Sequence, residues 1–318
     1  MSLLACILMV SCEKIPNTES PYIEGLSINN YPVIDGSTST LPLNTVIACE
    51  LLGLDYQWKE KTEKGRINFW AMEAQIKGSL KSKFDNVIKS SQTHNSIINV
   101  IDGEADLVLS ARTMSPDEKQ YAQNKGVTLI ETPIALDAFI FIVNPYNPIT
   151  TLTIKDIQHI YTGKVTDWTN FGVEISPDYS IIYPFIRNPN SGSQELMDML
   201  VMKDLEYYKD LPIYNETLVF TMAGLLDVIA SNPYAIGYTV YYYNEHIIRP
   251  GEKLKTIGIE GVHPSRQTIS NRSYPLTTEV YAVIRSDTDR SSMTYKIYEW
   301  LQTENGKQVI GKSGYIVN

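Results

Sequence analysis

The chain lacks the residues from which most metal and redox sites are built, with only three cysteines and four histidines among 318 residues. Neither type stands at metal-ligand spacing, so we predict no bound metal. The glycine spacings of P-loop and Rossmann nucleotide sites are absent, as is the Gly-x-Ser-x-Gly turn of a hydrolase. The sequence therefore predicts no cofactor and no catalytic residue. The histidines are widely separated: His94, His159, His246 and His263.

An excess of positive charge is also missing. Lysine and arginine number 27 against 36 acidic residues, which gives a formal net charge of −9. This balance argues against nucleic acid and against an anionic membrane surface as the main partner. A small anion remains possible, because local hydrogen-bond donors rather than net charge would hold it.

No apolar run is long enough to span a bilayer. The run at residues 3–11 has the length of a signal-peptide core and ends at Cys12, where the chain turns polar. The pattern resembles a bacterial lipobox, so we expect cleavage before Cys12, lipidation of its thiol and a tether to about residue 25. The alternative is a buried N-terminal strand. After processing, Cys49 would be the one unlipidated cysteine, which leaves no intramolecular disulfide.

The length exceeds that of a usual single core and predicts two lobes of α/β class. Hydrophobic content of 43% and charged content of 20% are ordinary for a soluble globular protein. Buried strands are predicted at 105–110, 128–133, 138–143, 181–186 and 235–240, and residues 56–65 form a charged excursion. We expect a signal and tether at 1–25, a first lobe from 26–136 and 239–318, and a second lobe at 137–238.

Two polar loops each follow a strand and lead into a helix. The first contains Ser37, Thr38 and Ser39, and Pro42 suits an early helical position. The second carries Arg187 and the run Ser191-Gly192-Ser193, with Ser191 and Gln194 in a capping-box pattern. Backbone amides at a helix N-terminus favour an anion, and arginine adds a charged planar fork. The alternative for either loop is an ordinary polar turn at a capped helix.

A third polar segment follows the strand at 105–110. Ser110 and Arg112 end that strand, and Ser115, Pro116 and Glu118 form a strong helix start. Ligands of open α/β sheets bind outside the C-terminal ends of strands, so Ser110 and Arg112 are candidate ligands. A further helix start is predicted at Thr153 with Asp156, and Gly237 should allow close packing of its strand.

Taken in order, these segments resemble the phosphate-binding proteins of ABC importers. The resemblance covers roughly Val33 to Tyr241 and is carried by Asp35–Ser39, Asp106–Arg112, Phe141–Pro145, Leu152–Thr153, Ile160–Lys164, Asp167–Trp168, Arg187 with Ser191–Ser193, and Ala235–Tyr238. It implies a two-lobed type II periplasmic-binding-protein fold, with mixed, mostly parallel sheets, flanking helices and two crossover strands. The oxyanion would bind between the lobes.

The resemblance also implies the function and its partners. The ligand-binding residues would be Ser37, Thr38, Ser39, Ser110, Arg112, Arg187, Ser191, Gly192 and Ser193. The ligand would be inorganic phosphate or a similar oxyanion, delivered to an ABC permease by a monomeric lipoprotein of the cell envelope, periplasmic or on the outer surface. Well-studied members place an acidic residue near the position of Arg112 to accept a proton from phosphate, and arginine has no acceptor. Another anion, a phosphorylated or sugar ligand, a sensor role, or a hydrolase using Ser191 or Ser193 remain alternatives.

Overall fold

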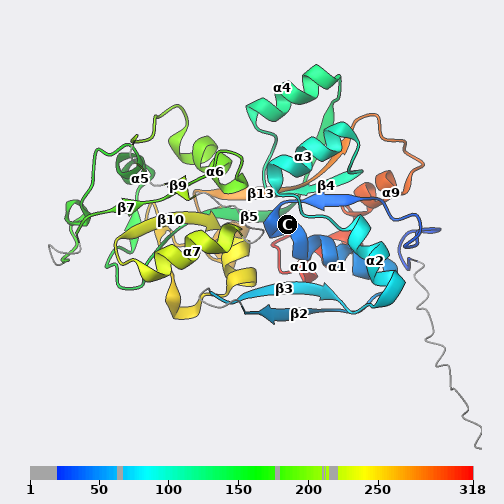
Figure 1. Cartoon of the computed structure of the whole chain (residues 1–318), viewed down its shortest axis with the longest axis horizontal. Coiled ribbons are helices and arrows are strands. Elements are labelled where there is room, and N and C mark those ends of the chain that lie inside the picture. Colours follow the sequence, from blue (N-terminus) through cyan, green and yellow to red (C-terminus); the bar gives the residue numbers. More distant parts are fainter. Residues whose placement is uncertain are drawn as a thin grey trace, which may run out of the picture.

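The computed structural model describes residues 20–62, 67–175, 180–209, 211, 213–214 and 221–317. The predicted signal run and Cys12 lie outside these residues. Two α/β lobes lie side by side (Figure 1) and share one central sheet. Its order is β1 (Ile34–Gly36), β4 (Leu107–Ser110), β13 (Thr277–Arg285), β5 (Leu129–Val143), β10 (Ala235–Val240) and β7 (Tyr183–Pro184), with β11 (Lys255–Thr256) also paired to β5.

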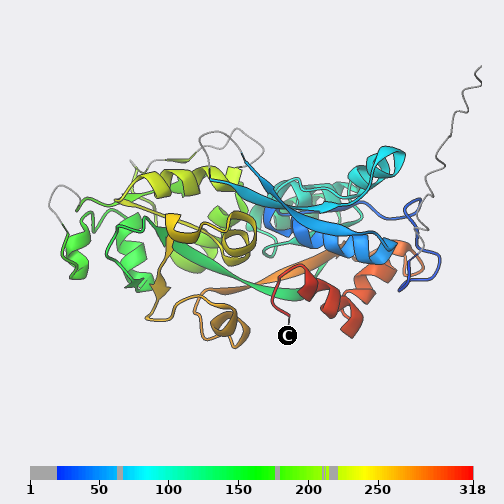
Figure 2. The same ribbon diagram turned by 90° about the horizontal axis from the view of Figure 1, so that it is seen from below.

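Strand β5 connects the lobes. Its first half pairs with β13 and its second half with β10 and β11, and Figure 2 shows it running from one lobe into the other. The sequence predicted two strands here, but the chain continues as one. Pro133 lacks an amide for the ladder, and the pairing with β13 skips Ile134 beside it in an irregularity of register.

Helices cover both faces of this sheet. Those that flank the first lobe are α1 (Leu41–Leu52), α2 (Gly78–Val87), α3 (Thr93–Asp102), α4 (Pro116–Lys125), α9 (Met293–Trp300) and α10 (Glu304–Lys312). Those of the second lobe are α5 (Ile154–Tyr161), α6 (Gly192–Met197), the π-helical turn η4 (Asp198–Met202) and α7 (Thr221–Ser231). The remaining turns are η1 (Thr38–Thr40), η2 (Trp168–Phe171), η5 (Tyr243–Ile248), η6 (Gly251–Lys253) and α8 (Arg266–Ser270).

Local sequence signals explain several helix boundaries. Thr153 accepts from the Asp156 amide at 3.0 Å and donates its own amide to the Asp156 carboxylate at 2.8 Å, which confirms the predicted capping box. Ser115 and Glu118 make the same reciprocal pair at the start of α4. Gly237 is confirmed as a close-packing position, because an added Cβ would lie 2.5 Å from Ile229 Cδ1 of α7. These contacts are local, or involve neighbouring elements, and the sequence pattern is sufficient to indicate them.

Two predictions about chain organisation need correction. The charged stretch after Leu54 is a strand, β2 (Tyr56–Lys61), which forms an antiparallel hairpin with β3 (Phe69–Ala74). Its alternating exposed and half-buried side chains let the charged residues face solvent. The return to the first lobe is also later than residue 239, because β11 pairs with β5 and β12 (Gly258–Ile259) pairs with β6 (Thr151–Leu152).

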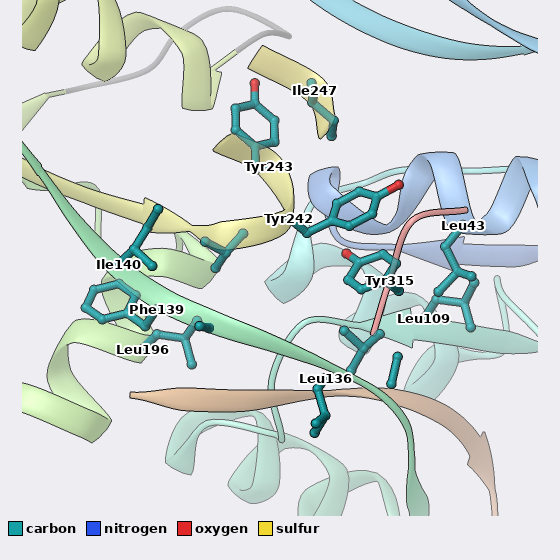
Figure 3. Close-up of a cluster of buried hydrophobic side chains, with 14 of the residues drawn as sticks. Leu43, Leu109, Leu136, Phe139, Ile140, Leu196, Tyr242, Tyr243, Ile247 and Tyr315 are labelled. Atoms are coloured by element: carbon teal, nitrogen blue, oxygen red, sulfur yellow. The ribbon is translucent and has the colours of Figure 1, made fainter. Parts of the chain in front are cut away.

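The lobes share a continuous hydrophobic core. Figure 3 shows the part around β5, where the rings of Tyr242 and Tyr315 lie face to face beside α1. Their centroids are 3.7 Å apart and the rings are parallel within 1°. Within the described ranges, no helix has both the length and the apolar character required to cross a membrane.

Candidate functional site

A small cavity lies where three loops of the first lobe meet the segment from β8 (Ile186–Arg187) to α6 of the second. We call it the interlobe cavity. Its volume is about 30 Å³, which exceeds the roughly 10–15 Å³ that one water needs. It is lined by Ser37, Thr38, Ser39, Gln92, Thr93, Ala111, Arg187, Ser191, Gly192, Ser193, Leu196 and Val240.

The cavity lies at the C-terminal ends of strands. Ser37 follows β1, Ala111 follows β4, and Arg187 is the last residue of β8, which pairs with β9 (Ile213–Tyr214). Parallel strands present their carboxyl ends at one edge, where the following loops converge on a ligand. The topology therefore explains why the loops after β1, β4 and β8, which are distant in sequence, line the same cavity.

Hydrogen bonds fix the first-lobe wall. The Ser37 hydroxyl accepts from the Ala111 amide at 2.9 Å and shares a hydrogen bond of 2.8 Å with the Thr93 hydroxyl. Thr40 donates its hydroxyl to the Leu109 carbonyl at 2.7 Å and so ties η1 to the end of β4. Because these hydroxyls are buried and mutually bonded, they are held in position before any ligand arrives.

On the second-lobe side, Arg187 is buried, with only 3% of its surface exposed. Its backbone amide donates to the Gln194 side-chain oxygen at 2.9 Å and to the Tyr238 hydroxyl at 3.1 Å. Gln194 therefore anchors the strand end rather than capping α6. The predicted Ser191–Gln194 capping box is wrong, since Ser191 makes no side-chain cap and its hydroxyl lies 3.1 Å from that of Ser193.

The two lobes touch at Gly192. A Cβ built on this residue would lie 2.3 Å from the Thr93 hydroxyl oxygen and 3.1 Å from its Cβ. No side chain fits there without displacing Thr93. Glycine therefore lets the lobes meet over the cavity, and the structure has the closed arrangement.

Arg112 and Ser110 lie in the adjoining core and do not line the cavity. Arg112 makes a two-pronged ion pair with Glu118, both bonds being 2.8 Å, and donates to the Thr113 carbonyl. The Ser110 hydroxyl donates to the Arg112 carbonyl at 2.6 Å. The buried carboxylate of Glu118 therefore neutralises the positive charge of Arg112. Glu118 also forms a hydrogen bond of 3.0 Å with His94.

A carboxyl group lies close to the link between the lobes. The Asp137 side chain in β5 accepts through Oδ1 from the amides of Ala138 at 2.8 Å and Tyr242 at 2.9 Å. Burial raises the pKa of Asp137 from an ordinary 3.8 to about 7, against the lowering effect of these two bonds. The neighbouring Tyr315 hydroxyl donates to the Ser39 carbonyl at 3.1 Å, which connects this region to the interlobe cavity.

The structure brings seven of the nine predicted ligand residues to one cavity, including Thr38, Arg187 and Ser193 from separate loops. Sequence reasoning missed Gln92, Thr93 and Ala111. The signal available in the sequence was the hydroxyl of Thr93, which stands at the first turn of α3. Within the part of the chain that the structure describes, no group of three or more His, Cys, Asp or Glu side chains is arranged to hold a metal.

The two lobes in contact, the loops at strand ends and the cavity between them, lined by hydroxyls and Arg187, have the architecture of a two-lobed binding protein for a small ligand. A family model described as "PBP superfamily domain" matches residues 71–302. The chain belongs to the PBP superfamily and has the type II periplasmic-binding-protein fold.

Individual relatives agree with this assignment. The chain is 23% identical over 212 residues to the phosphate-binding protein PstS of Borreliella burgdorferi, covering 66% of this chain and 71% of that protein. It is 24% identical over 228 residues to PstS of Staphylococcus epidermidis, covering 69% and 65%. An ABC-type phosphate transport receptor from Vibrio cholerae has a similar structure, with a TM-score of 0.61 at 20% identity over 90% of this chain and 99% of that one.

Proposed function

We propose that this protein is an extracytoplasmic substrate-binding protein that encloses phosphate, or a similar oxyanion, between its lobes and presents it to an ABC permease. The observation that carries the proposal is that the buried Arg187 and six serine and threonine residues from both lobes line one cavity. The relatives named phosphate-binding protein and phosphate transport receptor support the choice of ligand. No bond is made or broken in this function.

The chemistry of the wall suits a buried anion. Removing a dianion from water costs several kcal/mol, so a site must supply many charge-assisted donors in exchange. Arg187 supplies a permanent positive charge, and Ser37, Thr38, Ser39, Thr93, Ser191 and Ser193 supply hydroxyls. Closure excludes water, which strengthens each of these bonds, and the closed form would be what the permease recognises.

Calorimetric titration tests the ligand directly. We expect heat and a thermal shift with inorganic phosphate, and competition by sulfate, because among the described residues no Asp or Glu lines the cavity to accept the proton of hydrogen phosphate. Absence of binding to every oxyanion tried would refute the proposal. Sulfate binding without phosphate binding would favour the alternative of another anion.

Arg187→Ala measures the contribution of the buried guanidinium. Loss of a desolvated charge partner should cost about 2–4 kcal/mol, which is a thirtyfold to thousandfold rise in Kd for phosphate. Arg290→Ala serves as control, since Arg290 lies over the Tyr295 ring on the outside of the first lobe. Equal affinity in the Arg187 variant and the control would remove Arg187 from the ligand site.

The proposal includes attachment to the cell envelope through Cys12 and a monomeric state. Labelling of growing cells with palmitate, compared with Cys12→Ser, tests the anchor, and sedimentation tests the oligomeric state. A palmitate signal that survives in the serine variant would contradict the first.

A hydrolase is the second class to test. A serine nucleophile needs a base within hydrogen-bond reach. Ser191 and Ser193 bond one another, and no histidine lines the cavity within the described ranges. We therefore propose that a serine-reactive phosphonate will not label the protein. Labelling that is lost in Ser191→Ala or Ser193→Ala would favour the enzyme instead.

A further inference from the structure

A second, larger cavity adjoins the interlobe cavity. Its volume is about 390 Å³, within the range of roughly 300–1,000 Å³ that is usual for small-molecule sites. We call it the apolar cavity. Apolar side chains dominate its wall, with four contributed by β3 and two by η5: Phe69, Trp70, Ala71, Met72, Tyr243 and Ile247.

The two cavities share a wall. Thr38 and Gln92 line both. Gln92 has φ +69° and ψ 164°, a backbone conformation that residues other than glycine rarely adopt. Such strain is retained where the surrounding structure imposes it, and here it falls on the residue between the two cavities. The two cavities are therefore adjacent, and a ligand with groups in both would lie across Thr38 and Gln92.

Both lobes build the apolar cavity. The β2–β3 hairpin belongs to the first lobe, and η5 follows β10 of the second; Figure 3 shows Tyr243 and Ile247 together on η5. The Arg249 guanidinium holds the two sides together, since it lies 4.9 Å from the ring centroid of Trp58 and 4.3 Å from that of Trp70. An apolar group bound here would therefore contact both lobes and favour the closed form.

The interlobe cavity also suits an esterified anion. Hydrogen phosphate at neutral pH carries a proton that seeks an acceptor, and among the described lining residues there is no carboxylate to provide one. A phosphate monoester has its second pKa near 6, so at pH 7 it is mainly a dianion with no proton to place. Arg187 and the hydroxyls can donate to such a group as well as to inorganic phosphate.

We propose that the protein binds phosphate monoesters whose organic part is aromatic or apolar, with the phosphate in the interlobe cavity and the organic group in the apolar cavity. This inference rests on the proposed oxyanion function. It adds a ligand class and a second subsite, formed by β3 and η5.

The test is calorimetric titration of the full chain with inorganic phosphate and with phenyl phosphate. Burial of a phenyl group against Trp70 and Ile247 should make phenyl phosphate at least tenfold tighter than phosphate. Ala71→Phe fills the apolar cavity from β3 and should abolish this preference, while Kd for phosphate stays within twofold. Trp70→Ala is the second variant, and Tyr146→Ala, which removes a highly exposed ring elsewhere, is the control.

The outcomes separate the two proposals. Phosphate binding with phenyl phosphate equal or weaker overturns the second subsite alone. A preference for phenyl phosphate that persists in both Ala71→Phe and Trp70→Ala also overturns it, since the ring would then lie elsewhere. If neither ligand binds, the oxyanion function fails, and this inference with it.

Discussion

Replacement of Asp137 by asparagine should remove a pH dependence from the stability of this protein. The carboxyl group is 1% exposed, and its Oδ2 has no hydrogen-bond partner among the described residues. Burial therefore penalises the charged form and raises the pKa to about 7. Asparagine keeps the oxygen that accepts from the Ala138 and Tyr242 amides and carries no charge.

The sign and size follow from linkage. The folded pKa lies above the unfolded value, so the folded state holds more protons between pH 4 and pH 7. The stabilisation that Asp137 contributes is fully present below the unfolded pKa. It is lost as the pH rises from that value through about 7. A shift of about three units at 1.36 kcal/mol per unit amounts to about 4 kcal/mol in all, of which roughly 2–3 kcal/mol falls between pH 5 and pH 8.

Urea unfolding of both proteins at pH 5, 6, 7 and 8 measures the effect. Other groups titrate in both chains, so the difference between the two free energies of unfolding isolates residue 137. We expect Asp137→Asn to gain stability relative to the wild type by roughly 2–3 kcal/mol from pH 5 to pH 8. A constant difference across this range would refute the assignment of a buried, titrating carboxyl at the link between the lobes.

Two further predictions concern the contacts around the interlobe cavity. Gly192→Ala should weaken phosphate binding about tenfold to a hundredfold, because the new Cβ would clash with Thr93 as the lobes close. Unchanged affinity by calorimetry would show that closure does not need this contact. Glu118→Gln should lower the free energy of unfolding by about 3–5 kcal/mol, since it leaves the Arg112 charge buried without its ion-pair partner. Denaturant unfolding that matched the wild type would contradict the buried pair.

The sequence predicted helix caps and polar loops, because these features depend mainly on residues close together in the chain. The capping pairs Ser115–Glu118 and Thr153–Asp156 form as predicted, because both partners lie within one helical turn. The Ser191–Gln194 pair has the same spacing but does not form, because the Gln194 side chain bonds Arg187 and Tyr238 instead. The polar loops after strands were also located correctly, and they supply Ser37, Arg187 and Ser193 to the interlobe cavity. Strand-then-loop patterns determine which residues reach a sheet edge.

Tertiary structure decided the rest. The sequence pattern assigns Glu118 only to the capping box of α4. In the structure its carboxylate also forms an ion pair with Arg112, six residues earlier. The convergence of Thr93, Ala111 and Val240 on the cavity depends on strand order, which long-range pairing sets. The raised pKa of Asp137 likewise arises from burial between segments more than a hundred residues apart. The charge and hydrogen-bonding capacity of a residue are fixed by its type and can be read from the sequence. Its burial and its hydrogen-bond partners depend on which distant segments pack against it, and these are fixed only in the folded chain.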